Sequence, residues 1–168
     1  MQVATYSDKE IRMYEFLQNT AVGVLSSVTR NNDPHGAVVY FGIDKKFIVS
    51  ILTKSDTKKY DNLQHNSHVM LTVFETVTQT TVQLTGVAEE VSDPSKINEI
   101  AQMNMRATMK NSHGGIPPIS KLEAGSFTAF EIKPVLVRMA VYAHPDSGDY
   151  GELFESVSSF ELKDFRSS

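Results

Sequence analysis

Short connections between β-rich segments restrict the fold of this chain more than any other feature of its sequence. Runs of β-branched and aromatic residues recur along the chain, and most connections between them hold only a few residues. Strands joined so closely must run antiparallel, because a parallel crossover needs about a dozen residues or more. The predicted strands are residues 21–29, 36–43, 46–53, 68–76, 80–92, and two that meet at Pro134 within 125–143.

The first of these segments shows which side of a strand we expect to be buried. In residues 21–29, Val22, Val24 and Val28 share one parity, so we predict that this side faces a core. Residues 36–43 and 46–53 are separated by a short Asp-Lys turn and form a predicted hairpin. Pro134 indicates an edge or a bulge, because proline cannot donate a ladder hydrogen bond.

Three helices are predicted between the strands. Residues 7–19 open with Ser7 and carry Glu10 three positions later, the spacing of a capping box. Residues 56–66 are helical in composition, and residues 92–110 begin with Ser-Asp-Pro, a strong helix start. About seven antiparallel strands with inserted helices predict a mainly β barrel rather than a wound α/β sheet. We expect one domain over residues 1–168, with a core at 7–143 and a partly irregular tail at 144–168.

The composition argues against several classes of protein. Among 168 residues, 20 are acidic and 16 are basic, giving a net charge of −4, whereas a general nucleic-acid binder usually has a basic excess. The chain has no cysteine, which excludes disulfides and thiolate metal sites, and we predict no metal site. No apolar run approaches the ~20 residues that span a bilayer, and the first residues lack a signal-peptide core. We expect a soluble cytoplasmic protein without nucleic-acid or membrane partners.

Residues 51–63, ILTKSDTKKYDNL, gather hydroxyl and lysine side chains where a strand passes into a helix. If the helix begins near Asp56, the backbone amides of Thr57, Lys58 and Lys59 point outward at its positive end. Two lysines and several hydroxyls beside these amides form a site suited to a phosphate. The structural alternative is a solvated helix start, because Ser, Thr and Asp are favoured there as N-caps without any ligand.

The order of the motifs along the chain supports the phosphate interpretation. A strand ends in Thr, a hydroxyl residue and two basic residues follow, the next helix carries Asn-Leu, and a later strand closes in Gly before an acidic pair. These residues are Thr53, Thr57, Lys58, Lys59, Asn62, Leu63, Gly86, Glu89 and Glu90. In this order the chain resembles the FMN-binding split-barrel proteins of the pyridoxamine 5′-phosphate oxidase-like superfamily. The resemblance covers roughly the first 95 residues, with a weaker match over residues 130–139.

The resemblance implies a split β-barrel of six to seven mostly antiparallel strands that binds FMN at the interface of a homodimer. The second strand would lay its backbone along the flavin ring, and the third would end beside the ring and the phosphate. The basic pair and a neighbouring hydroxyl would bind the phosphate, and the fifth strand would reach the cofactor from the facing subunit or sheet. In the same order, these positions are Val38, Val39 and Tyr40; Leu52 and Thr53; Thr57, Lys58 and Lys59; and Thr81.

The chain departs from the family pattern at two places. Ala37 stands where the family often has an arginine that helps to hold the phosphate. The chain also has no tryptophan, and its tail, ESVSSFELKDFRSS, lacks the Trp- and Arg-containing signature of true pyridoxamine-phosphate oxidases. We therefore do not expect pyridoxamine phosphate as the substrate, and we place the chain in the broad uncharacterised branch of the superfamily.

These features predict an FMN-dependent oxidoreductase that uses bound flavin for electron or hydride transfer to an unknown small molecule. The sequence identifies no catalytic side chain. One alternative keeps the fold and changes the cofactor to a deazaflavin or haem. Another is a non-enzymatic flavin-binding or stress-related module. A deazaflavin has a longer acidic tail, and the basic cluster of Lys54, Lys58 and Lys59 is small, which favours FMN.

Overall fold

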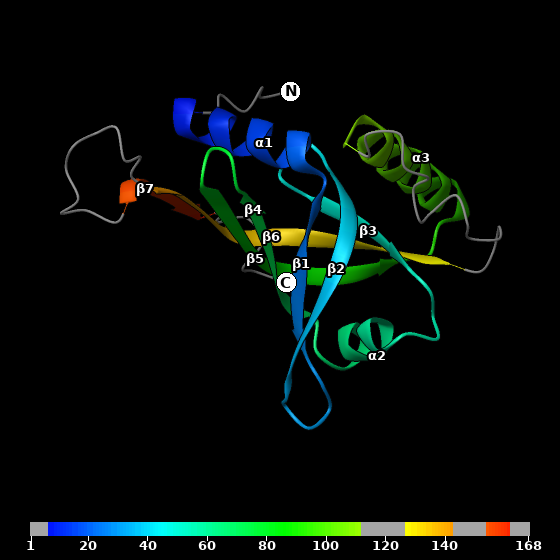
Figure 1. Cartoon of the computed structure of the whole chain (residues 1–168). Helices are drawn as coiled ribbons and strands as arrows, with labels where there is room; N and C mark the ends of the chain where they lie inside the picture. The colour runs from blue at the N-terminus through cyan, green and yellow to red at the C-terminus, as the bar shows by residue number, and fades with distance from the viewer. Residues whose placement is uncertain (1–6, 112–126, 143–153, 162–168) are drawn as a thin grey trace.

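The computed structural model describes residues 7–111, 127–142 and 154–161 (Figure 1). Antiparallel strands dominate, and three helices are inserted between them, as the sequence predicts. The elements are α1 (Asp8–Thr20), β1 (Val22–Val28), β2 (Pro34–Ile43), β3 (Val49–Thr53), α2 (Lys58–His65), β4 (His68–Glu75), β5 (Thr80–Val91), α3 (Pro94–Asn111), β6 (Thr128–Tyr142) and β7 (Phe154–Glu161).

The strands form a split barrel, which confirms the predicted fold class. They follow the order β3-β2-β1-β4-β5-β6-β7, all neighbours are antiparallel, and an additional pairing of β3 with β6 closes six of them into a barrel. The first part of β6, residues 128–132, pairs with β3, and its later part, residues 136–142, pairs with β7. The barrel therefore opens along β6.

Strand β6 corrects the prediction of two strands that meet at Pro134. It runs unbroken from Thr128 to Tyr142. The register with β5 shifts here, because Thr85 pairs with Leu136 and Gly86 pairs with Pro134. The extra residue forms a β-bulge, which accommodates a proline that has no N–H to donate. The predicted alternative of a bulge at Pro134 is thus confirmed, and the predicted break is wrong.

Part of the predicted tail at 144–168 forms a strand, and the remainder of that tail lies outside the described residues. Residues 154–161 form β7 along the later part of β6. Polar residues interrupt the apolar alternation of this segment, so its pattern does not indicate a strand. The predicted capping box is confirmed: the Ser7 hydroxyl accepts a hydrogen bond from the Glu10 amide, and the Glu10 carboxylate accepts one from the Ser7 amide.

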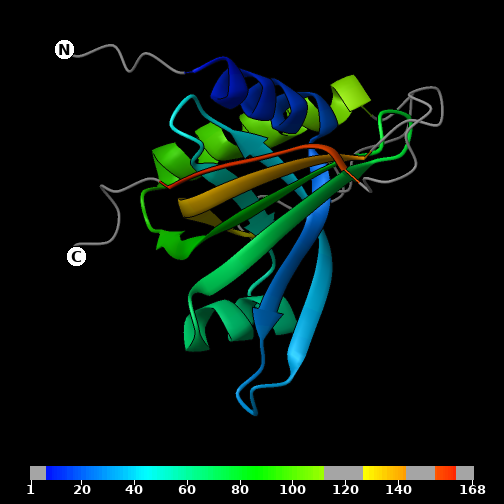
Figure 2. The same cartoon turned by 90° about the vertical axis from the view of Figure 1, so that its left-hand side faces the viewer.

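The helices lie at opposite ends of the barrel. In both views α1 and α3 lie above the barrel and α2 lies below it (Figures 1 and 2). The barrel interior is filled by alternating apolar side chains, such as Leu71 and Val73 of β4 and Val82 and Leu84 of β5, which are all buried. We call the end covered by α2 the α2 end of the barrel.

Strand β1 presents to the core the opposite side from the one predicted. Val24 is 41% exposed, whereas Leu25 is buried and fills the barrel. The inward positions also approach β4 closely, since a Cβ added at Gly23 would lie 2.9 Å from the Thr72 carbonyl oxygen. Counting valines by parity therefore gave the wrong face. The valine side of β1 forms part of the outer surface of the barrel.

Candidate functional site

The segment between β3 and α2 forms a compact turn of hydroxyl groups. The hydroxyls of Thr53 and Thr57 lie 3.0 Å apart, and Thr57 also donates a hydrogen bond to the Lys54 carbonyl at 2.9 Å. Thr57 is the N-cap, because its hydroxyl accepts a hydrogen bond from the Tyr60 amide and its backbone is extended. The helix therefore begins at Lys58, two residues later than Asp56.

This later start changes which amides are free at the positive end of α2. The Tyr60 amide is capped by Thr57, and the Thr57 residue itself lies outside the helix. The amides of Lys58 and Lys59 remain without a hydrogen-bond partner among the described residues. Two adjacent N–H groups at a helix N-terminus can donate to one anion.

Lys59 is a charged residue at the α2 end of the barrel whose side chain is partly removed from solvent. It is partly buried, and burial lowers the pKa of its ammonium group below the ordinary value. Within the described parts of the chain, no carboxylate forms a salt bridge with it or with Lys58, which is exposed. A partly desolvated cation without a counter-charge is costly unless an anion binds beside it.

A carboxylate of β5 that contacts α2 is engaged by side chains other than the two lysines. Glu90 of β5 accepts hydrogen bonds from Gln64 at 2.5 Å, from Thr128 at 2.8 Å and from the Tyr60 hydroxyl at 3.4 Å. Its neighbour Glu89 forms a salt bridge with Lys133. These contacts attach α2 to β5 and β6, and among the described residues neither lysine of α2 has a salt bridge.

Buried contacts fix α2 on the barrel. The Asn62 side-chain amide donates to the Ser27 hydroxyl of β1 at 3.1 Å, and both residues are buried. Leu63 enters the barrel core, and the ring of Tyr60 meets that of Phe130 edge to face at 5.9 Å. The positive end of α2 is therefore held in a defined place rather than left on a mobile loop.

The predicted flavin-facing residues of β2 lie on both faces of the strand. Val38 is 67% exposed and Tyr40 is 37% exposed, and both point outward, while Val39 is buried in the core. Val39 could therefore contact a ligand only through its backbone, as the resemblance implies. Leu52 is turned away from the barrel core, because it packs with Ile100 in the cluster under α3.

Thr81 is far from the lysines within one chain. It lies near the start of β5, while α2 contacts Glu90 near the end of the same strand. These positions are nine residues apart, roughly 30 Å at a rise of about 3.3 Å per residue. One copy of the chain therefore does not bring Thr81 together with Lys58 and Lys59.

Two polar residues beside Thr81 were not singled out in the sequence. Gln83 follows on the same side of β5, and Arg138 is its cross-strand partner on β6. Together with Thr81 they line a small outer pocket of about 210 Å³. Parity along β5 could have identified Gln83, but only the pairing of β5 with β6 places Arg138 beside it.

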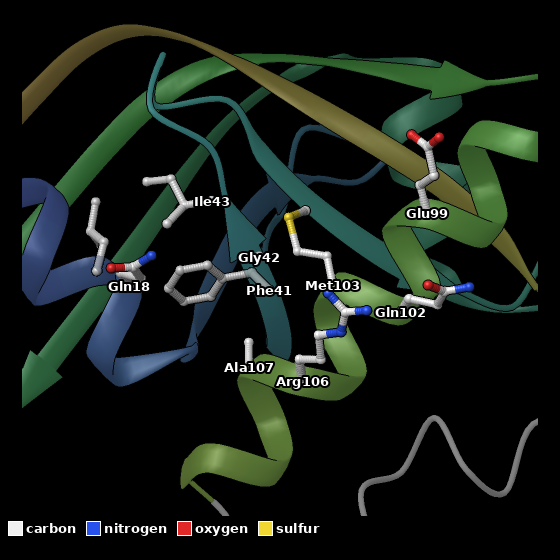
Figure 3. A pocket seen from close by; sticks show the side chains of 10 residues that line it. Gln18, Phe41, Gly42, Ile43, Glu99, Gln102, Met103, Arg106 and Ala107 are labelled. Carbon is white, nitrogen blue, oxygen red and sulfur yellow. The ribbon is translucent and has the colours of Figure 1, made fainter.

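A larger cavity of about 540 Å³ lies at the opposite end of the barrel, between α1, β2 and α3 (Figure 3). Its floor is apolar and includes Phe41 and Ile43, and its rim carries Gln102 and Arg106. None of the sequence-predicted site residues lines it. Met103 of α3 packs here against Gly42, where an added Cβ would lie 2.6 Å from the methionine Cε.

The architecture and the α2 end together define the class of protein. A six-stranded antiparallel barrel that opens along β6, with a helix start that carries two lysines at one end, is a split barrel. The family model described as pyridoxamine 5′-phosphate oxidase matches residues 9–140, and the chain therefore belongs to this family. No curated protein sequence matches the chain significantly.

Solved structures share this fold at low sequence identity. The heme binding protein from Mycobacterium smegmatis superposes with a TM-score of 0.67 at 16% identity over 94% of this chain, which spans only 60% of that protein's length. A pyridoxamine 5′-phosphate oxidase-related, FMN binding protein from Nostoc punctiforme gives 0.57 at 14% identity, covering 92% of this chain and 93% of that one. An F420 reductase gives 0.58 at 16% identity, covering 73% and 93%.

These three proteins are named for three different cofactors. At such identities the likeness shows the fold alone, and the fold accommodates flavin or a related cofactor without selecting one. Among the helices in the described part of the chain, none is long and apolar enough to cross a membrane.

Proposed function

We propose that this protein binds FMN at the α2 end of the barrel and acts as a flavin-dependent oxidoreductase. The observation that carries the proposal is Lys59, a partly buried cation at a helix start with no acidic partner among the described residues. The ammonium and amide groups of Lys58 and Lys59 gather at this helix start, which the Thr57 hydroxyl caps while it donates to the Lys54 carbonyl. This donor set fits a phosphate monoester, which offers several acceptor oxygens and two negative charges.

The residues of the chain have separate roles in this proposal. Lys58 and Lys59 bind the phosphate by charge, and the helix start adds backbone donors. The outward backbone and side chains of Val38 and Tyr40 offer an apolar strand surface for the flat ring. The bound flavin would supply the electron or hydride transfer, while the protein holds and orients it.

The visible absorption spectrum of freshly purified protein tests this function. We expect flavin absorbance bands, release of FMN on denaturation, and renewed binding when FMN is added to the apoprotein. Parallel titrations with F420 and with haem compare the cofactors of the related folds. Colourless protein that takes up none of them would contradict a cofactor-binding role, and tighter binding of F420 or haem would replace FMN.

Reduction of the bound flavin separates an enzyme from a binding module. We expect a nicotinamide or another electron donor to bleach the flavin bands, and an acceptor to restore them. Bound FMN that no donor can reduce would favour the non-enzymatic alternative. Comparing which small-molecule acceptors reoxidise the reduced flavin would then identify the class of substrate.

We further propose that the protein is a homodimer formed through what we call the outer apolar face. Val24 pairs with Val38 across β1 and β2, and Val22 pairs with Tyr40. Monomeric proteins rarely expose a large contiguous apolar patch. The face consists of Val22, Val24, Val38, Tyr40 and Phe74, the last of which is 53% exposed on β4.

A two-fold dimer through this face would also give Thr81 a role. Thr81 is the cross-strand partner of Phe74, so it lies beside the outer apolar face. In a two-fold arrangement the same face is used by both copies. Thr81 of one copy would then face the other copy, which agrees with the expected contact from the facing subunit.

Replacement of Val38 by glutamate is expected to dissociate this dimer. Val38 is the most exposed residue of the outer apolar face, and burying an unpaired carboxylate in an interface costs several kcal/mol, of the order of 3 or more. Size-exclusion chromatography with light scattering should show a dimer for the wild type and a monomer for the variant. The control is Val77→Glu, because Val77 is 83% exposed in the turn after β4. A monomeric wild type, or a dimeric V38E protein, would show that this interface is wrong.

A further inference from the structure

His35 of β2 carries a buried nitrogen that no described residue satisfies. Its Nδ1 atom is covered, and no hydrogen-bond partner for it exists among the described residues. Buried polar atoms are almost always paired, and leaving one unpaired is costly. His35 as a whole is only partly buried, so part of the residue remains accessible to solvent.

His35 lies at the α2 end of the barrel, on the side of β2 that faces inward. It is the cross-strand partner of Ser27, whose hydroxyl accepts the hydrogen bond from Asn62 of α2. Asn62 follows Lys58 by four residues and Lys59 by three, and residues at these spacings lie on adjacent parts of one helix surface. Through Ser27 and Asn62, His35 is therefore linked to α2 within about one turn of the two lysines.

The next inward position of β2 carries a small side chain. Ala37 follows His35 by two residues, so both side chains point to the same side of the strand. Alanine offers only a methyl group and no hydrogen-bond donor there. Rotation of the imidazole about χ2 is soft, since this torsion has a broad distribution. The ring can therefore turn Nδ1 toward a ligand held between β2 and the start of α2.

We propose that His35 is an additional phosphate-binding residue, which donates a hydrogen bond from its imidazole to the phosphate monoester held by Lys58 and Lys59. The inference rests on the proposed FMN function and extends its phosphate site from α2 to β2. At position 37 of β2, alanine offers no hydrogen-bond donor. His35 supplies the donor from the same face of the strand, one inward position earlier.

Comparison of FMN with riboflavin tests this role, because riboflavin has the same ring and no phosphate. We expect His35→Ala to weaken FMN binding about tenfold or more, as the loss of a hydrogen bond to a charged group would, and to leave riboflavin binding unchanged. His35→Gln should recover part of the loss, since its amide can donate. The control is His65→Ala, an exposed histidine of the last turn of α2. Equal losses for both ligands, or no loss for either, would overturn the inference.

Inorganic phosphate provides a test that needs neither the flavin nor a variant. In the wild-type apoprotein, addition of phosphate should shift the imidazole NMR signals of His35 and leave those of His65 in place. Unmoved His35 signals would overturn the inference even if FMN binds. If the wild type binds no FMN while phosphate still shifts His35, the proposed function fails and the phosphate site stands.

Discussion

Replacing Lys58 and Lys59 together by methionine is expected to weaken FMN binding by about 100-fold or more. Each hydrogen bond to a charged group contributes about 1.5–3 kcal/mol, so two of them contribute about 3–6 kcal/mol. Every 1.4 kcal/mol is about tenfold in affinity, and the exposed position of Lys58 places the expected loss toward the lower end. Quenching of flavin fluorescence on titration of the apoprotein measures the change directly.

The stability of the double variant distinguishes a lost contact from a lost fold. Burial lowers the pKa of Lys59, so between this lowered value and the unfolded value the folded protein binds fewer protons than the unfolded chain. The penalty for the buried charge is present at neutral pH and is relieved only as the pH rises through the lowered pKa. Methionine removes that penalty, and the apoprotein should therefore unfold at the same urea concentration or higher.

The matched control for this experiment is Lys45→Met with Lys46→Met. These lysines are also adjacent, and they lie in the turn between β2 and β3, away from the α2 end of the barrel. The control variant should bind FMN like the wild type. If the Lys58 and Lys59 double variant retained FMN with unchanged affinity, the phosphate would not be held at the start of α2, and the cofactor site would have to be sought elsewhere.

Gly86→Ala is expected to destabilise the folded protein by about 2 kcal/mol or more. An added Cβ would lie 2.4 Å from the carbonyl oxygen of Lys133 and 2.9 Å from Cγ2 of Ile132. The first of these atoms belongs to the backbone of β6 beside its bulge, and a rotamer change cannot move it. Overpacking typically costs about 1–3 kcal/mol, and a backbone clash falls in the upper part of that range. The urea midpoint at a fixed protein concentration measures the loss.

Gly36→Ala is the matched control, because Gly36 is also a strand glycine. There an added Cβ would meet only Cγ1 of Val24, at 3.4 Å. Alanine also reduces the conformational freedom of the unfolded chain, which alone stabilises a protein by about 0.4–1 kcal/mol. The control should therefore be neutral or slightly stabilised. Equal midpoints for both variants would mean that β5 and β6 do not approach each other as closely at the bulge as described.

The sequence by itself determined the local elements and their antiparallel order. Short connections, the capping box at Ser7 and the proline at the start of α3 depend on residues close together in the chain, and all three appear in the structure. The same holds for the turn of Thr53 to Lys59, whose caps and lysines are set within one helical turn. The sequence also identified the family, because the ordered motifs lie on these local elements.

Only the tertiary structure decided which faces and ends of these elements meet. The burial of Leu25 instead of Val24, the continuity of β6 through Pro134, and the distance of Thr81 from the lysines all depend on strand pairing. Pairing joins residues far apart in the chain, and a parity pattern cannot tell a core face from a face that another copy could cover. The unpaired nitrogen of His35 likewise becomes visible only when β1, β2 and α2 are packed together.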